Sequence, residues 1–177
     1  MAITDQSYLN WQKELSSRKW YRRFWVFCGI YSVALIFLLG LYLLYLGETK
    51  VVILAFLAFV LGRGIISALI FFSHKKVRPY QKLNFNTFHS WFFSPKTKHY
   101  SSFPSDHAIS MSAISTVFAV YHPYFIIPAI VICAINGWAR IILGYHYILD
   151  IFAGWALGIL SALAVVYWLS PMLFTSH

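Results

Sequence analysis

The stretch "FWVFCGIYSVALIFLLGLYLLYLG", residues 24–47, contains no charged residue, and it decides the fold class. About 20 consecutive apolar residues suffice for an α-helix to cross the hydrocarbon core of a bilayer. The rest of the chain has the same character, because 60% of its 177 residues are hydrophobic and 11% are charged. A soluble domain is usually about 45–50% apolar and about 25% charged. We therefore expect one membrane-embedded domain spanning residues 1–177.

Four more apolar runs follow along the chain. The second, residues 51–73, is interrupted by Arg63, and the fifth, residues 151–169, ends before Ser170 and Pro171. The third, residues 107–121, is short and spans only if the preceding turn lies inside the headgroup region. The fourth, residues 123–142, contains a proline, which membrane helices tolerate. The pattern predicts an all-α bundle of about five transmembrane helices within residues 24–170.

Residues 1–23 form a separate piece in which aromatic and basic side chains alternate. Such a mixture suits a helix that lies in the membrane interface. The aromatic residues are Trp11, Trp20 and Tyr21, and the basic residues are Lys13, Arg18, Lys19, Arg22 and Arg23. The net charge of +9 favours lipid headgroups or phosphorylated lipids as partners over nucleic acid, because the basic residues lie between apolar spans.

The order of the crossings brings two polar segments to one side of the membrane. If residue 1 and the segment 74–106 are separated by two crossings, they share a side. Two further crossings then return residues 140–150 to that same side. We therefore expect the reactive residues of both segments to meet at one end of the bundle.

The residues that meet there suit phosphoryl transfer. His146 and Asp150 are four residues apart, a spacing that puts both on one face of a helix. A carboxylate that accepts the proton of one imidazole nitrogen leaves the other nitrogen as a directed nucleophile or base. His107 opens the third apolar run, where backbone N–H groups favour an anion. The cations that we expect to hold phosphate oxygens are Lys75, Lys76, Arg78 and Arg140.

This chemistry requires no metal ion or cofactor, because positioning and charge neutralisation supply most of the catalysis in phosphoryl transfer. The sequence contains no Asp, Glu, His or Cys cluster with metal-ligand spacing apart from the pair that the nucleophile reading already uses. We therefore expect a metal-independent reaction.

Three short motifs resemble the signature of the type 2 phosphatidic acid phosphatase (PAP2) superfamily. They are Arg78-Pro79, the Pro-Ser-Asp-His segment at 104–107, and Arg140 followed by His146 and Asp150. The resemblance implies that His146 is the nucleophile and forms a phosphohistidine, oriented by Asp150. It implies that His107 protonates the leaving group, and that Arg78 and Arg140 hold the phosphate with Ser105.

The chain departs from this signature at three positions. Phe71 stands where the family has its first lysine, so Lys75 or Lys76 is the expected substitute, and Ala139 replaces the serine before Arg140. Asp106 stands where the signature has glycine. That aspartate and the small size resemble the bacterial branch that dephosphorylates undecaprenyl diphosphate, which is the expected reaction, with the monophosphate and inorganic phosphate as products.

Several alternatives remain open at this stage. The substrate could be phosphatidylglycerophosphate or another lipid monophosphate, or the protein could be a non-catalytic transporter or scaffold whose His and Arg residues line an ion path. Asp106 either caps the third helix or contacts the substrate or His107. Arg63 is either a functional charge or a side chain that snorkels to the interface or pairs within the bundle. The aromatic residues between 80 and 103 either anchor the loop at the interface or contact an isoprenoid chain.

The sidedness of the site follows from two conflicting signals. Twelve of the 14 Lys and Arg residues lie on the side of residue 1, and this bias indicates the cytoplasm. The resemblance implies the outer face, where spent undecaprenyl diphosphate is released. Because residues 1–23 are expected to lie in the interface and not in a loop, we expect the site on the extracytoplasmic face.

Overall fold

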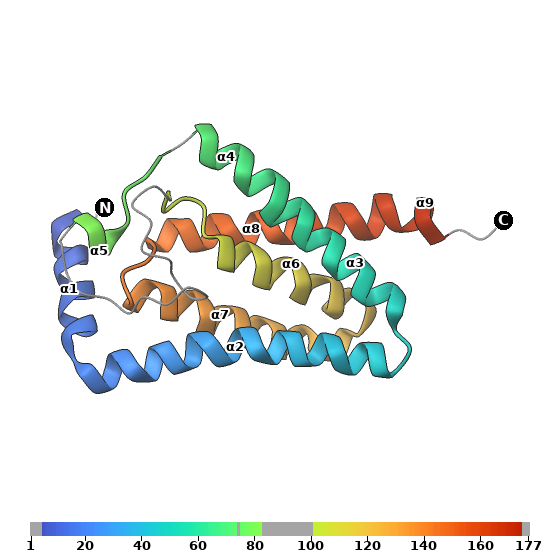
Figure 1. The fold of residues 1–177 in the computed structure, drawn as a ribbon, viewed down its shortest axis with the longest axis horizontal. Helices are drawn as coiled ribbons and strands as arrows, with labels where there is room; N and C mark the ends of the chain where they lie inside the picture. The colour runs from blue at the N-terminus through green and yellow to red at the C-terminus, as the bar shows by residue number, and fades with distance from the viewer. Residues whose placement is uncertain (1–4, 74, 83–100, 175–177) are drawn as a thin grey trace.

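A computed structural model describes residues 5–73, 75–82 and 101–174, and every regular element in those residues is a helix (Figure 1). Long helical segments run side by side, and α1 (Asp5–Ser17) lies across one end of them. The all-α helical bundle is therefore confirmed, and a separate N-terminal helix is present. The remaining elements are α2 (Lys19–Tyr45), α3 (Thr49–Phe59), η1 (Val60–Ile66), α4 (Ser67–Ser73), α5 (Pro79–Lys82), α6 (Asp106–Tyr121), η2 (Pro123–Phe125), α7 (Ile126–Ile142), α8 (Ile148–Ala164), η3 (Val165–Leu169) and α9 (Ser170–Phe174).

The first boundary differs from the expected one. The sequence predicted that the interfacial helix covers residues 1–23, whereas α1 ends at Ser17 and the first long helix already begins at Lys19. Arg18 between them has extended backbone angles, φ −74° and ψ 105°, so it forms the corner. Residues 19–23 are therefore the basic, aromatic end of a membrane helix, where such side chains anchor it at the interface.

Four helical segments in the described part of the chain are long and apolar enough to cross a membrane: 19–45, 49–73, 123–142 and 148–174. The third predicted span, α6, is not among them: it has 16 residues and is about 24 Å long, shorter than the hydrocarbon core of about 30 Å. Because the neighbouring helical segments are longer, the first residues of α6 lie inside the bundle and not at its end.

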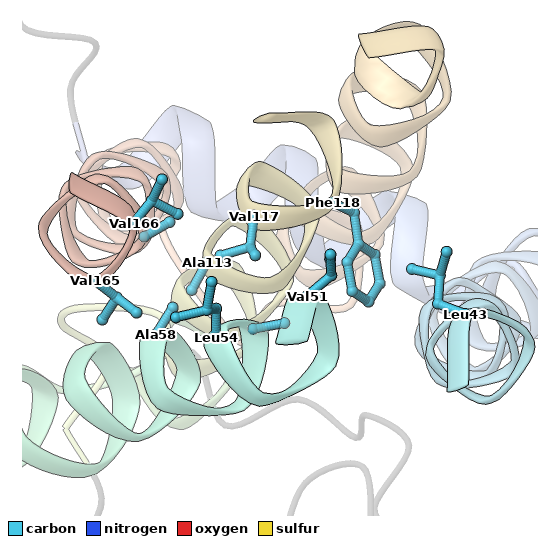
Figure 2. Packing of buried hydrophobic residues seen from close by; sticks show 11 residues of the cluster. Leu43, Val51, Leu54, Ala58, Ala113, Val117, Phe118, Val165 and Val166 are labelled. Carbon is cyan, nitrogen blue, oxygen red and sulfur yellow. The ribbon is translucent and has the colours of Figure 1, made fainter. Parts of the chain in front are cut away.

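The hydrophobic core of the bundle lies between α3, α6 and the end of α8 with η3 (Figure 2). Leu54 and Ala58 of α3 face Val117 of α6, and Val165 of η3 completes the layer. Phe118 packs toward Leu43 near the end of α2. These side chains are at most 2% exposed, so α6 is held on several sides by its neighbours.

The contact between α6 and α8 is unusually close because α8 carries two glycines one turn apart. A Cβ at Gly154 would lie 2.7 Å from the Cβ of Ala108 and 2.9 Å from the carbonyl oxygen of Ser105. A Cβ at Gly158 would lie 2.4 Å from the carbonyl oxygen of Ile109. Small residues four apart allow membrane helices to approach closely, and this contact fixes the start of α6 against α8.

The two polar segments meet at the end of the bundle where α1 lies, as the crossing pattern predicts (Figure 1). The Ser102 N–H donates to the Lys76 carbonyl at 2.7 Å, and the Tyr80 N–H donates to the Gly144 carbonyl at 3.0 Å. The turns between α2 and α3 and between α6 and α7 lie at the opposite end. The helix order alone therefore gathers residues 75–82, 101–107 and 140–150.

Candidate functional site

The connection between α7 and α8 presents His146 to the site. Helix α7 ends in a turn in which the Tyr145 N–H donates to the Arg140 carbonyl and the Gly144 N–H donates to the Ile141 carbonyl, both at 3.0 Å. Gly144 has φ +71°, a left-handed conformation that glycine adopts without a steric penalty. The chain therefore leaves the helix before His146.

This geometry corrects the expectation that His146 and Asp150 share a helix face. His146 precedes α8, whereas Asp150 lies within its first turn. The Nδ1 atom of His146 is 3.9 Å from Asp150 Oδ2, which is too long for a hydrogen bond. The same nitrogen is 2.7 Å from the carbonyl oxygen of Ser102.

The Ser102 carbonyl fixes the tautomer of His146. A carbonyl oxygen only accepts hydrogen bonds, so Nδ1 carries the proton and Nε2 carries the lone pair. The side chain is 4% exposed. Burial and the positive charge of Arg78 hold the pKa of His146 well below its usual value, against the opposing effect of the Ser102 hydrogen bond. The imidazole is therefore neutral at neutral pH and holds a directed lone pair.

Asp150 organises the site without touching His146. Its carboxylate accepts from the Tyr147 N–H at 2.8 Å, from the ammonium of Lys76 at 2.8 Å and from the hydroxyl of Ser102. The first of these bonds belongs to a capping box that starts α8. By holding Ser102, Asp150 positions the carbonyl that in turn orients His146. Asp150 thus acts on the position of His146 indirectly, through Ser102.

Of the four cations expected to hold phosphate, Lys76, Arg78 and Arg140 lie at the site and Lys75 does not. Lys76 pairs with Asp150 and lies 4.3 Å from the centre of the Tyr147 ring, whereas Lys75 is exposed. Arg78 donates to the carbonyls of Tyr145 and Ser101, both at 3.4 Å. Lys76 therefore occupies the place expected for either lysine.

Arg78 and Arg140 differ in how deeply they are placed. Arg140, in the last turn of α7, is 1% exposed, and its guanidinium lies 5.8 Å from the centre of the Tyr145 ring. Arg78 is partly buried, and this burial lowers the pKa of its guanidinium. A guanidinium remains protonated even after such a shift, so both side chains supply forked donors for phosphate oxygens.

The start of α6 supplies the third part of the site. Ser105 is the N-cap, because its hydroxyl accepts from the Ala108 N–H at 3.5 Å, and its own N–H donates to the Asp150 carbonyl at 3.1 Å. Ser105 is fully buried. The capping role considered for Asp106 therefore belongs to Ser105, and His107 follows in the first turn of α6.

Asp106 and Arg63 form a pair that links α6 to the second span. The Asp106 carboxylate accepts from the Ser67 hydroxyl, and its other oxygen lies 3.8 Å from a terminal nitrogen of Arg63. Arg63 is thus paired with Asp106, and both side chains remain partly exposed.

One contributor to the site was not predicted from the sequence. Gln12 of α1 is fully buried, and its amide nitrogen donates to the carbonyls of Ile141 at 2.7 Å and His146 at 3.3 Å. Tyr8, one turn earlier, stacks on Tyr147 with ring centres 6.3 Å apart. Helix α1 therefore supports the connection that carries His146.

The structure describes only part of the predicted aromatic loop anchor. Tyr80 packs edge-on against Tyr145 at 6.1 Å. The remaining aromatic residues of the predicted loop anchor lie outside the described residues; they are Phe85, Phe88, Trp91, Phe92, Phe93 and Tyr100.

Within the described ranges, no group of three or more His, Cys, Asp or Glu side chains comes together in a way that could hold a metal ion.

Comparison with known proteins identifies similar sequences and a similar fold. A family model described as "PAP2 superfamily" matches residues 51–172. The chain is 40% identical over 77 residues to the bacitracin transport permease protein BcrC of Bacillus licheniformis, covering 44% of this chain and 37% of that one. It is 34% identical over 96 residues to a lipid A 1-phosphatase of Rhizobium etli, covering 51% and 41%. These matches span less than half the length of the curated relatives.

A solved structure shares the fold over nearly the whole chain. It is a transmembrane PAP2-type phosphatidylglycerolphosphate phosphatase from Bacillus subtilis, with a TM-score of 0.68 at 19% identity. The match covers 99% of this chain and 90% of that one. At this identity the likeness concerns the arrangement of helices.

Proposed function

Because the chain belongs to the PAP2 superfamily, we propose that this multi-pass membrane protein is a lipid phosphatase that hydrolyses undecaprenyl diphosphate through a phosphohistidine. The observation that carries the proposal is the hydrogen bond from His146 Nδ1 to the Ser102 carbonyl. It leaves the lone pair of Nε2 in a fixed direction, near cations that can bind phosphate oxygens. Buried neutral imidazole in such surroundings is the form that attacks phosphorus.

The reaction follows from the positions of the side chains. His146 Nε2 attacks the terminal phosphorus, while Arg78, Arg140 and Lys76 neutralise the phosphoryl oxygens. The bond from phosphorus to the bridging oxygen breaks, and His107 gives that oxygen a proton. Water, deprotonated by His107, then attacks the phosphohistidine and releases inorganic phosphate. Each histidine returns to its starting protonation state.

Two features support a diphosphate substrate. The described site carries four cations, Arg63, Lys76, Arg78 and Arg140, against the carboxylates of Asp106 and Asp150. The resulting excess of two positive charges suits a highly charged anion. Asp106 in the Pro-Ser-Asp-His segment also matches the branch whose substrate is undecaprenyl diphosphate. We place the site on the extracytoplasmic face, where that lipid is released.

A lipid monophosphate is the second candidate substrate. The similarity to proteins named lipid A 1-phosphatase favours it, with 34% identity over 96 residues. A phosphatidylglycerophosphate phosphatase falls in the same class. These substrates use the same nucleophile and differ in the leaving group, which is a lipid alkoxide and not a phosphate monoester.

The test is release of inorganic phosphate by the purified protein from a panel of lipid diphosphates and monophosphates with excess EDTA. We expect activity with EDTA, the highest kcat/KM on undecaprenyl diphosphate, and none in His146→Ala. His107→Ala should lose about 10²–10⁴-fold on monophosphates and less on diphosphates, because a phosphate monoester leaves more readily than an alkoxide.

Four results would contradict the proposal. Activity that requires a divalent ion would remove the metal-free mechanism, and a preference for monophosphates would favour the second substrate. Rapid-quench labelling of His146→Ala but not of His107→Ala would exchange the roles of the histidines. Absence of phosphate release from every lipid would support a transporter or scaffold instead.

A further inference from the structure

The Arg63–Asp106 ion pair borders the site but has no part in the mechanism described so far. Arg63 lies in η1, a π-helical segment, and Asp106 is the first residue of α6. One terminal nitrogen of Arg63 lies 3.8 Å from Asp106 Oδ2, and the Ser67 hydroxyl donates to Oδ1. The pair therefore has a defined geometry that is set by two helices. Short π-helical segments are frequent at functional sites.

This pair is exposed although Arg63 lies within a membrane-spanning segment. The side chains of Arg63 and Asp106 are 46% and 40% exposed, and Arg63 falls inside the span 49–73. Ionised groups are costly in hydrocarbon and face a bundle interior or a hydrated cavity. The exposed faces of this pair are therefore accessible to a ligand, and we expect them to face water or headgroups and not lipid chains.

The position of the pair relative to His107 defines which part of a substrate it would meet. Asp106 directly precedes His107 in the first turn of α6, so the Arg63–Asp106 pair lies next to the residue expected to protonate the leaving group. Arg78 is held by the carbonyls of Ser101 and Tyr145, on the side of the nucleophile. Because Arg63 pairs with the neighbour of His107 and not with the residues around His146, we infer that it lies on the leaving-group side.

We propose that Arg63 binds the lipid-proximal phosphate of a lipid diphosphate, and that Asp106, itself held by the Ser67 hydroxyl, orients its guanidinium before the substrate enters. This subsite rests on the proposed function. When His146 attacks the terminal phosphorus, the electron pair of the broken P–O bond moves onto the proximal phosphate. Arg63 neutralises that charge while His107 supplies the proton. A lipid monophosphate has no second phosphate, so Arg63 has no ligand in that reaction.

The test compares Arg63→Gln with the wild type on a polyprenyl diphosphate and on the monophosphate of the same chain, so that only the second phosphate differs. Loss of one charge-assisted hydrogen bond should lower kcat/KM for the diphosphate about 10–100-fold. The value for the monophosphate should change less than about threefold. Arg63→Lys, which keeps the charge and loses the fork, should give an intermediate ratio.

Arg18→Gln is the matched control, because Arg18 forms an exposed pair with Glu14 at 3.2 Å away from the site. It should leave both rates unchanged. Equal losses on both substrates in Arg63→Gln, or no loss on either, would overturn the subsite while leaving the phosphatase proposal intact. If Arg63→Gln does not fold, Arg63→Lys decides, since an unchanged ratio of the two rates overturns the subsite. A wild type that hydrolyses only the monophosphate overturns the diphosphate proposal and the subsite together.

Discussion

Replacing Gly154 by alanine tests whether the contact between α6 and α8 sets the geometry of the site. The new methyl group would lie 2.9 Å from the Ser105 carbonyl oxygen and 2.7 Å from the Ala108 Cβ, where ordinary contact begins at 3.4 Å. The Ser105 backbone must therefore retreat by about 0.5 Å, and the packing around it loses part of its dispersion energy. Overpacking of this kind costs about 1–3 kcal/mol.

The same displacement reaches the catalytic groups. Ser105 caps α6 two residues before His107, and its N–H is bonded to the Asp150 carbonyl. Because a misplacement of 1 Å can cost about 10²-fold in rate, a shift of half that size should lower kcat about 10-fold. The Tm should fall by about 4–8 °C for a destabilisation of about 2 kcal/mol.

Gly40→Ala is the matched control in the middle of α2. A Cβ there meets only Phe118 Cζ at 3.8 Å, so this variant gains helix propensity without a clash. Thermal denaturation in detergent and initial rates of phosphate release measure both effects. If Gly154→Ala matches Gly40→Ala in Tm, the helices do not approach this closely. A lower Tm with an unchanged rate per folded molecule would show that the contact does not position His107.

Two further predictions concern the protonation of the nucleophile and the side of the membrane on which it lies. The acid limb of the kcat/KM profile should fall below pH 6.5, because burial and Arg78 lower the pKa of His146. Arg78→Gln should move that limb to higher pH by removing a cation, whereas Arg18→Gln should not, and an unmoved limb in Arg78→Gln contradicts the assignment. A cysteine at Lys75, in a background lacking Cys28 and Cys133, should react with a membrane-impermeant reagent on intact cells, whereas one at Lys50 should react only after lysis. The reverse pattern places the site in the cytoplasm.

The helices and their order could be predicted from the sequence because hydrophobicity is a local property of each run. The uncharged stretch 24–47 became most of α2, and residues 123–142 became η2 and α7. The corner at Arg18 escaped prediction because basic and aromatic residues suit both an interfacial helix and the end of a spanning one. The short third run became α6, the central helix of the core.

The composition of the site was predictable, but its hydrogen bonds were not. His146 and Asp150 have helical spacing, yet Gly144 ends α7 and places His146 in the connection. A glycine after an apolar helix is a recognisable stop signal. Gly144 therefore indicates that His146 and Asp150 do not lie on one continuous helix. The Ser102 carbonyl accepts the hydrogen bond from His146 that was expected for Asp150. Ser102 lies 44 residues from His146, and a local sequence pattern does not predict a contact over that distance.

Gln12 connects helix α1 to the backbone that carries His146. Helix α1 lies crosswise at the end of the bundle (Figure 1), and one amide group in it holds the carbonyls of Ile141 and His146. A helix in the interface responds to anionic lipids, curvature and lateral pressure. If α1 lies in the membrane interface, as the sequence predicts, a tilt of α1 would act on the backbone of His146 through this amide group, and the geometry of the site would depend on lipid composition.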